Sequence, residues 1–232
     1  MTRSRDRIFV RGGSDVSFID YPGRIAAILF AASCNFRCGY CHNPLLVNVP
    51  VTASYWRYDE LLERISSLRG KIDGVVVTGG EPTLHADMPD IIDELHSLSL
   101  PIKLNTNGST PSAVRASLSS LSHVSLDIKT ALNKYRRVCT IPDAAIRVHE
   151  TLSLLRESPI VWDLRITAAP GILDEADVDA LLPVLTGAHV ILQKFDPANT
   201  LDENYASMIP YTSKTMERIR ARIAGVAVCE LI

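Results

Sequence analysis

The sequence has no apolar segment long enough to cross a bilayer. Its longest purely apolar run is Ile25–Ala32, whereas a membrane-spanning helix needs about 20 apolar residues. The arginine-containing start of the chain is followed by no apolar stretch of the kind that secretory signals contain. We therefore expect a cytoplasmic protein with no membrane partner.

A surplus of positive charge is also absent. The chain has 24 lysine and arginine residues against 26 aspartate and glutamate residues, a formal net charge of −2. Nucleic-acid-binding domains usually carry clustered basic residues and a high isoelectric point, and here the basic residues are scattered along the chain. We therefore expect no nucleic acid partner.

An even number of cysteines is missing as well: the chain has five, so they cannot all be paired in disulfides within the chain. Three of the five form a C-x3-C-x2-C run, Cys34, Cys38 and Cys41. In a reducing compartment, such close spacing indicates a metal site or catalysis rather than disulfides. Closed zinc sites and closed iron–sulfur cubes usually take four protein ligands. Three thiolates on a four-iron cube would therefore leave one iron open to another molecule.

A zinc site is the alternative for these cysteines, with His42 as the fourth ligand. Cys41 and His42 are adjacent in the sequence, which is awkward for two ligands of one tetrahedral ion, and no second ligand pair follows.

Strand-like and helix-like segments alternate along the chain. Strands are expected at 25–32, 74–77, 102–104, 124–128, 160–167 and 190–195, with a further short strand at 226–231. Repeated strand–helix units predict a mostly parallel sheet, and six units are too few for a closed eight-fold barrel. The prediction is a single α/β domain, a partial (β/α)6 TIM-like barrel. Within residues 1–232 we expect an amino-terminal segment (1–24), a barrel core (25–197) and a carboxy-terminal helix and strand (198–232).

Unusual polar and glycine residues recur where these strands end. They are Cys34–Cys41, Gly79, Gly80 and Glu81, Asn107, Asp127 and Lys129, Arg165, and Gln193 with Phe195. Ligands bind at the carboxyl ends of the strands in parallel α/β folds. Each feature also has an ordinary interpretation: Gly-Gly-Glu-Pro as a turn, Asp127 and Lys129 as an ion pair, and Arg165 as part of a salt bridge.

Taken together, these sequence motifs resemble those of the radical S-adenosylmethionine (SAM) superfamily. The resemblance is carried by the three cysteines with Tyr40 and by Gly79–Pro82, and it covers nearly the whole chain. Within the superfamily the chain is similar to the glycyl-radical-enzyme activases, and especially to the activating proteins of anaerobic ribonucleoside-triphosphate reductases. Weaker strings support this narrower resemblance: Phe18–Arg24, Cys38–Pro44, Leu126–Lys129, Arg165–Gly171 and Gln193–Pro197.

The resemblance implies a radical SAM oxidoreductase with two cofactors, a [4Fe–4S] cluster and SAM. Cys34, Cys38 and Cys41 would bind three irons, and the open iron would chelate the amino and carboxylate groups of SAM. One electron from the reduced cluster would split SAM into methionine and a 5′-deoxyadenosyl radical, which takes hydrogen from an unactivated C–H bond. Cluster potentials extend to about −700 mV, which is low enough for this step.

The resemblance also assigns SAM contacts to the other residues at the strand ends. Tyr40 would lie beside the adenine, and Gly79, Gly80 and Glu81 would receive the methionine amino group. Further contacts are implied for the ribose and carboxylate (Asp127, Lys129 and Arg165), for the adenine (Gln193 and Phe195), and for the cofactor more generally (Asn107).

The implied partners are a glycyl radical enzyme, with class III anaerobic ribonucleotide reductase as the first candidate, and flavodoxin or ferredoxin as electron donor. Asp20 is a hypothetical positioning group for the partner's glycine loop. Asn105 stands where related activases often have an aspartate that binds a monovalent cation, and Tyr21 stands where pyruvate formate-lyase activases have glycine. No cysteine-rich insertion for an auxiliary cluster is present.

Two other functions stay open at this point. One is a radical SAM enzyme that acts on a small molecule, as the deazapurine synthases do. The other is a non-catalytic binding protein stabilised by zinc.

Overall fold

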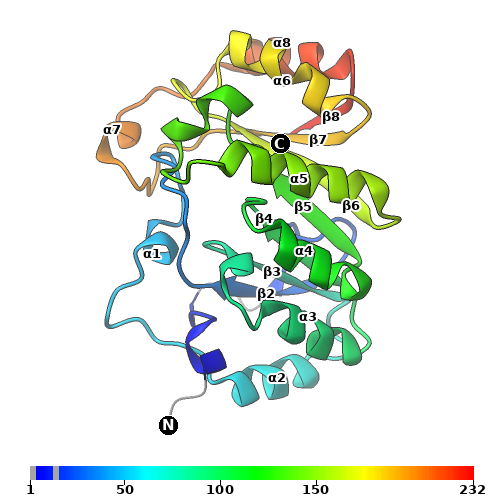
Figure 1. Cartoon of the computed structure of the whole chain (residues 1–232). Helices are drawn as coiled ribbons and strands as arrows, with labels where there is room; N and C mark the ends of the chain where they lie inside the picture. Colours follow the sequence, from blue (N-terminus) through cyan, green and yellow to red (C-terminus); the bar gives the residue numbers. More distant parts are fainter. Residues whose placement is uncertain (1–3, 13–15) are drawn as a thin grey trace.

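The computed structural model describes residues 4–12 and 16–232. One eight-stranded sheet runs through it, with the strands in sequence order from β1 to β8 (Figure 1). β1 is antiparallel to β2, and every later neighbouring pair is parallel. The strands are β1 (Val16–Ser17), β2 (Ala26–Ala31), β3 (Gly74–Gly79), β4 (Ile102–Thr106), β5 (His123–Asp127), β6 (Val161–Ala168), β7 (His189–Lys194) and β8 (Val228–Leu231). Within the described residues β1 and β8 are the two edges, so this sheet is an open partial barrel.

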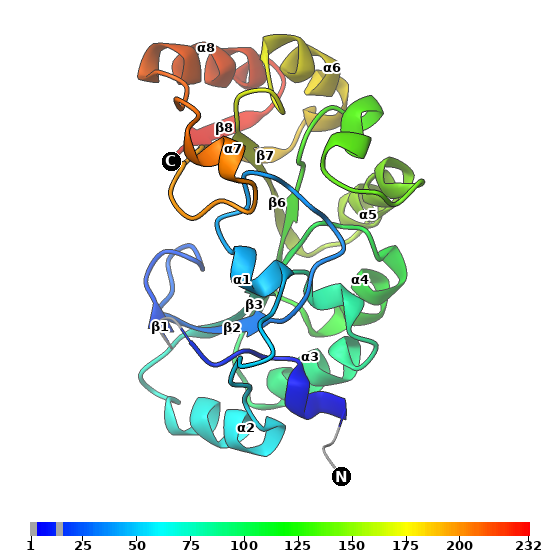
Figure 2. The ribbon, with the colours of Figure 1, turned by 90° about the vertical axis from the view of Figure 1, so that its left-hand side faces the viewer.

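Helices lie in the connections between the parallel strands, and the longer ones cover the outer face of the sheet (Figures 1 and 2). The α-helices of the described residues are α1 (Pro44–Val47), α2 (Tyr58–Ser67), α3 (Met88–Ser97), α4 (Pro111–Ser117), α5 (Ala144–Glu157), α6 (Glu175–Leu185), α7 (Glu203–Ala206) and α8 (Ser213–Ala224). The short α1 and α7 lie apart from this layer, beside the segment that joins β2 to α1 (Figure 2).

The sequence forms these elements because apolar residues recur with the period of each. In α3 the buried residues Met88, Ile91, Ile92 and Leu95 repeat at helical spacing. In β3 the run Val75–Val77 is buried on both faces, as expected for a parallel strand between the interior and a helix layer. A single large apolar cluster reaches from Ile8 to Ile223.

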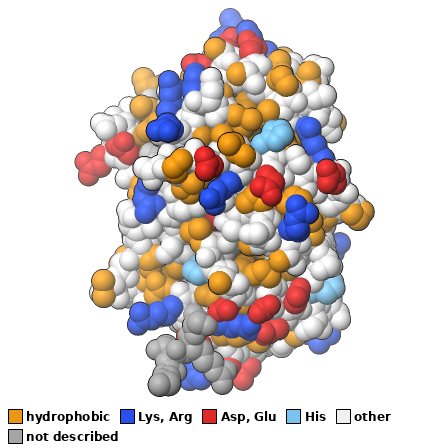
Figure 3. Space-filling view, in the orientation of Figure 1, with side chains coloured by type: hydrophobic (Ala, Val, Ile, Leu, Met, Phe, Trp, Pro, Cys, Tyr) orange, Lys and Arg blue, Asp and Glu red, His pale blue; other side chains and the backbone are white. Residues whose placement is uncertain are grey.

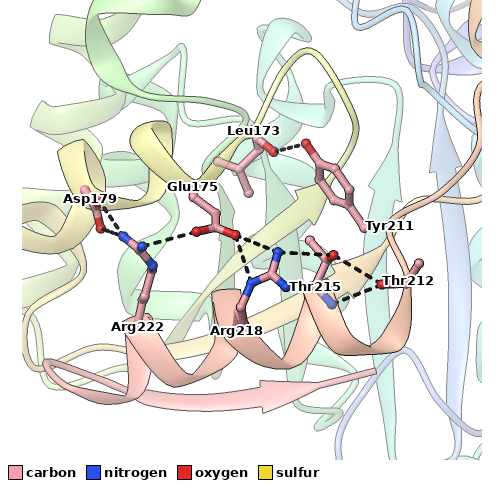
Figure 4. Close-up of polar contacts among 8 residues, drawn as sticks. All are labelled: Leu173, Glu175, Asp179, Tyr211, Thr212, Thr215, Arg218 and Arg222. Carbon is pink, nitrogen blue, oxygen red and sulfur yellow. Dashed lines mark hydrogen bonds and ion pairs between the residues drawn. The ribbon is translucent and has the colours of Figure 1, made fainter.

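Helix α8 is attached to α6 by ionic contacts (Figure 4). Arg218 binds Glu175 at 2.9 Å, and Arg222 binds Asp179 at 2.6 Å. These pairs are exposed, and exposed pairs contribute at most about 1 kcal/mol each. Full burial of a large apolar side chain contributes roughly 1.5–3 kcal/mol, so buried Met216, Ile219 and Ile223 hold α8 in place more strongly.

The inner face of the sheet carries a buried polar network. His123 on β5 lies 2.6 Å from the Asp163 carboxylate on β6, and Ser125 donates to the same oxygen at 3.0 Å. Burial lowers the pKa of Lys103 on β4, and its ammonium donates to the carbonyl of Asp20 at 2.8 Å. Burial alone would raise the pKa of Asp163, but His123 and Lys103 outweigh it and lower this pKa. Barrel interiors are usually filled by branched apolar residues, so this polar filling is a distinctive feature of the chain.

The six predicted parallel strands are confirmed, and the further strand at the carboxy-terminal end pairs with β7 as a seventh. The short elements β1, α1 and α7 were not predicted. No helix in the described part of the chain combines the length and the apolar character needed to span a membrane. On the face shown in Figure 3, basic and acidic side chains are interspersed.

Candidate functional site

A cavity of about 250 Å³ opens at the carboxyl ends of the parallel strands. Segments far apart in the sequence line it: the loops after β2, β3, β4 and β5, and the ends of β6 and β7. Eleven of the predicted site residues meet there, namely Cys34, Cys38, Tyr40, Cys41, Gly79, Gly80, Asn107, Asp127, Lys129, Arg165 and Gln193. The predicted convergence of these side chains is therefore present in the fold.

The cysteine loop begins directly after β2 with a tight turn. Ser33 adopts a positive φ of 67°, which is uncommon for a residue other than glycine. The backbone N–H of Phe36 points at Cys34 Sγ, 3.4 Å away, and the N–H of Cys41 donates to the carbonyl of Cys38 at 3.0 Å. The loop thus turns all three thiols toward one cavity.

Gly79 and Gly80 let the next loop lie directly against the cysteine loop. Gly80 N–H donates to Ala31 O at 2.8 Å, and Glu81 N–H donates to Ser33 O at 2.7 Å. A Cβ at residue 80 would lie 1.9 Å from Ser33 O, and one at residue 79, where φ is +128°, would lie 2.3 Å from Ala31 O. Only glycine permits this approach, so the two loops behave as one unit.

Glu81 does not line the cavity. Its side chain is fully buried, with 0% exposure. Oε1 accepts hydrogen bonds from Thr83 N–H, Thr83 Oγ1 and Thr106 Oγ1, and Oε2 accepts one from Asn107 N–H. Burial raises its pKa, and these four donors oppose that shift. This carboxylate ties the loops after β3 and β4 together. The contact of Gly79, Gly80 and Glu81 with the methionine amino group stays a prediction.

Asn107 connects the same unit to the cysteines. Its amide Nδ2 donates to Asn35 Oδ1 at 2.9 Å and lies 3.9 Å from Cys34 Sγ. Asn35 in turn donates to Ser109 Oγ at 2.8 Å. The predicted site residue Asn107 therefore orients the loop that carries the thiols.

Charged groups face the cavity from β5 and β6. Lys129 forms an ion pair with Asp127 at 2.8 Å, as in the ordinary interpretation of these two residues. Burial alone would lower the pKa of Lys129, but Asp127 and the nearby cysteines raise it above its usual value. Arg165 on β6 is the register partner of Asp127 on β5. The buried Nε of Arg165 has no hydrogen-bond partner within the described structure. An unpaired guanidinium N–H at a cavity wall suits an anionic group such as a carboxylate.

Phe195 lies behind the cavity wall rather than in it. It is 1% exposed and packs edge-to-face on Tyr205, with ring centroids 5.9 Å apart. Tyr205 packs in the same way on Tyr40 at 6.2 Å. Phe195 thus supports the Tyr40 ring through Tyr205, and its contact with the adenine stays a prediction.

Sequence reasoning did not assign several lining residues a SAM contact: Asp20, Phe30, Phe36, His42, Asn43, Val47, Thr78, Asn105 and Thr167. Thr167 could have been found, since it lies two residues after Arg165 on the same strand face. Asn105 is more informative, because its buried Oδ1 has no partner within the described structure and its Nδ2 donates to Thr78 Oγ1 at 3.2 Å.

The arrangement of the thiols can be compared with what each metal group needs. In the described part of the chain, no three His, Cys, Asp or Glu side chains converge as ligands of one metal ion would. Zinc requires such convergence, whereas the cysteines of a four-iron cluster bind separate irons. Three thiols that line one cavity would bind three separate irons of such a cluster and leave the fourth iron open.

In the metal-free protein, Cys38 is expected to react with iodoacetamide very slowly at neutral pH. Burial raises the pKa of Cys34 to about 11 and that of Cys38 to about 12, and only the thiolate is nucleophilic. At pH 8 the reactive fraction of Cys38 is on the order of 10⁻⁴, and it rises tenfold per pH unit. Peptide mass spectrometry of the folded and the urea-unfolded chain between pH 7 and 10 measures both rates. Equal rates in the two states would contradict the burial argument.

Comparisons with known proteins agree with this geometry. Residues 28–182, more than half of the chain, match the family model described as "Radical SAM superfamily". A protein of Methanocaldococcus jannaschii named "Putative glycyl-radical enzyme activating enzyme" is 27% identical over 210 residues, covering 87% of this chain and 86% of that protein. A 7-carboxy-7-deazaguanine synthase of Methanothermobacter thermautotrophicus is 32% identical over 111 residues, covering 47% of this chain and 43% of that enzyme.

A solved structure shares the fold across most of this chain. The crystal structure of Streptococcus suis SuiB bound to S-adenosylmethionine aligns with a TM-score of 0.65 at 14% identity, covering 89% of this chain and 49% of SuiB. The family match, the three-cysteine loop and this architecture lead to one conclusion: the chain belongs to the radical SAM superfamily, which implies a [4Fe–4S] cluster and SAM as its cofactors.

Proposed function

We propose that this radical SAM enzyme is an activase that generates a glycyl radical on a partner enzyme, with class III anaerobic ribonucleotide reductase as the first candidate. A relative named as a glycyl-radical enzyme activating enzyme supports the proposal, because the similarity spans 87% of this chain. The proposed electron donor is a flavodoxin or a ferredoxin.

The residues of the cavity form two groups, one for the cluster and the methionine end of SAM and the other for its nucleoside. Cys34, Cys38 and Cys41 would hold the cluster, which supplies the one electron that cleaves SAM to methionine and a 5′-deoxyadenosyl radical. Arg165, with its unpaired Nε, would bind the methionine carboxylate. The backbone of Gly79 and Gly80, which lines the cavity, would receive the amino group.

The remaining lining residues would position the nucleoside. Lys129, already oriented by Asp127, would fix the ribose end, and Tyr40 and Gln193 would lie beside the adenine. Fixing SAM against the target C–H bond is a positioning task, and such positioning can lower a barrier by about 7–11 kcal/mol.

An exposed apolar tip beside the cavity is the observation that supports a macromolecular substrate. Phe18 and Ile19 are 75% and 88% exposed, and the next residue, Asp20, lines the cavity. The tip is rigidly built: Ser17 Oγ accepts from the N–H groups of Ile19 and Asp20, both at 3.1 Å, and donates to Asp20 Oδ2 at 2.6 Å. Adjacent exposed apolar side chains at a site mouth are typical of a protein-binding surface.

A second hollow, about 280 Å³ in volume, shares Phe30, His42 and Asn43 with the cavity. Pro44 and Leu45 are among its other lining residues. An extended glycine-bearing segment could lie along this hollow and reach the cavity.

A small-molecule substrate is the second candidate function. It is favoured by the similarity to a 7-carboxy-7-deazaguanine synthase, which is confined to 47% of this chain. Such a substrate gives no reason for an exposed Phe18–Ile19 tip.

The deciding experiment mixes the reduced holoenzyme, SAM and an anaerobic ribonucleotide reductase under strict anaerobiosis. A glycine-centred doublet in the EPR spectrum of the reductase is the expected result. Production of 5′-deoxyadenosine without a doublet, repeated with other glycyl radical enzymes, would reject the activase proposal. Consumption of a deazapurine precursor instead would favour the second candidate.

The double variant Phe18→Ser/Ile19→Ser is expected to separate SAM cleavage from radical transfer. Both side chains are exposed, so folding and uncoupled cleavage should stay close to wild type, whereas the yield of glycyl radical should fall at least about tenfold if burying the two side chains contributes even 1.4 kcal/mol to docking. EPR spin counting and chromatographic measurement of 5′-deoxyadenosine give the two readouts. The exposed Val51, changed to Ser, is the matched control. An unchanged radical yield in the double variant would exclude the tip as a docking surface.

A further inference from the structure

A buried lysine connects the interior of the barrel to the loop at residues 17–20. Lys103 on β4 is 2% exposed and does not line the cavity, and its Nζ donates to the backbone carbonyl of Asp20 at 2.8 Å. Among the described residues, Lys103 forms no ion pair with a carboxylate. An isolated buried ammonium is costly, and an apolar side chain is the ordinary filling of a barrel interior. The position of Lys103 therefore calls for an explanation other than packing.

The charge of Lys103 is balanced at longer range by Asp163 on β6. Burial lowers the pKa of Lys103, and the Asp163 carboxylate opposes this shift. The hydrogen bonds to Asp163 come from His123 and Ser125, both to Oδ2, whereas its buried Oδ1 has no hydrogen-bond partner in the described structure. Lys103 is thus bound to the loop at Asp20 rather than to the carboxylate that balances its charge.

The residue after Asp20 is held by the same part of the sheet. Tyr21 is 5% exposed, and its ring packs edge-to-face on His123 of β5, with ring centroids 5.9 Å apart and an interplanar angle of 81°. Gly74 at the start of β3 leaves room for this ring, because a Cβ there would lie 3.0 Å from it. Two consecutive residues are therefore fixed to the sheet directly after the exposed apolar tip.

Asp20 joins the interior, the tip and the cavity. Its backbone carbonyl accepts from Lys103 inside the barrel, and its carboxylate accepts from Ser17 Oγ, which closes the turn that carries the tip. Asp20 also lines the cavity. The contact made by Lys103 therefore sets the position of the tip relative to the cavity.

We propose that Lys103 is a positioning residue for radical transfer to a protein substrate, because it fixes Asp20 and with it the tip on which the substrate docks. The inference rests on the proposed function, in which a glycine-bearing segment of the partner enzyme reaches the cavity. A misplacement of about 1 Å can slow a reaction roughly 100-fold. A tip released from Lys103 still binds the partner, but it no longer holds the target C–H bond in line with the reacting atom of SAM.

The variant Lys103→Met removes the charge and the donors of this side chain and keeps a long, unbranched chain. At a saturating concentration of the partner, the ratio of glycyl radical to 5′-deoxyadenosine is expected to fall at least about tenfold, as measured by EPR spin counting and chromatography. Because this change leaves the Asp163 charge unbalanced, Lys103→Met/Asp163→Asn is measured beside it and should show the same loss. Ser125→Ala is the matched control, since it removes a hydrogen bond to Asp163 and leaves the contact between Lys103 and Asp20 in place.

Hydrogen exchange of the holoenzyme gives a second readout, which does not depend on activity. The N–H groups of Ile19 and Asp20 both donate to Ser17 Oγ, so peptides covering residues 17–24 should exchange faster in both Lys103 variants and at the wild-type rate in Ser125→Ala. A wild-type ratio of radical to 5′-deoxyadenosine in both Lys103 variants, or an equal loss in Ser125→Ala, would overturn the inference. Absence of a glycyl radical with the wild type would instead reject the proposed function, whereas faster exchange in the Lys103 variants alone would still support the anchoring of the tip.

Discussion

Changing Cys38 to serine is expected to give a folded protein that assembles no stable cluster and releases no detectable 5′-deoxyadenosine. A four-iron cluster held by three thiolates loses one of its three protein ligands in this variant. Because no other cysteine lines the cavity, nothing replaces the missing sulfur. Iron analysis after anaerobic reconstitution should fall from about four irons per chain in the wild type, and the brown colour should be lost.

Cys229→Ser is the matched control for this experiment. Cys229 lies on β8, is half-buried and does not line the cavity, so iron content and SAM cleavage should stay at wild-type values. Full iron loading in the Cys38 variant would show that the three-cysteine assignment is wrong. Full zinc loading of the wild type with no iron would point to the non-catalytic binding protein.

Changing Glu81 to glutamine is expected to lower the free energy of unfolding by about 1–3 kcal/mol, the cost of leaving a buried donor unsatisfied. The two Glu81 oxygens accept from two backbone N–H groups, those of Thr83 and Asn107, one on each oxygen. A glutamine amide supplies only one oxygen, so its NH₂ must face one of these two N–H groups. The hydroxyls of Thr83 and Thr106 can rotate to adapt, but a backbone N–H cannot.

Urea denaturation of the metal-free chain measures this loss of stability. Glu203→Gln is the control, because Glu203 is exposed on α7 and its change should stay within about 0.5 kcal/mol. Iron loading of the Glu81 variant should also decrease, since Asn107 connects this carboxylate to Asn35 and Cys34. A variant as stable as wild type would contradict the role of Glu81 as the joint between the two loops.

Much of the site was predictable because it depends on one topological rule. Parallel strands bring their carboxyl ends to one edge, so the polar residues after each predicted strand had to meet. Asp127, Arg165 and Gln193 were located in this way, and the cavity contains all three. The cysteine run could be recognised without any prediction of the fold, because its spacing is a local feature of the sequence.

The remaining features depend on contacts that no local pattern records. Glu81 is part of a motif, yet its carboxylate points into the core because Thr106 and Asn107 offer donors there. Phe195 follows the end of β7, yet it is buried against Tyr205 from α7 and does not line the cavity. The elements β1, α1 and α7 span two to four residues each, which is too short for hydrophobic periodicity to indicate them.

In the loop at residues 17–20, two side chains hold the shape of the turn and two others are exposed at the surface. Ser17 and Asp20 close the turn, and Lys103 anchors it from inside the barrel. Phe18 and Ile19 take no part in those bonds except through the backbone N–H of Ile19. Their side chains can therefore be exchanged without rebuilding the scaffold. Under the proposed function, exchanging these two side chains would change the partner enzyme that docks, while the cysteine loop and the cavity would stay unchanged.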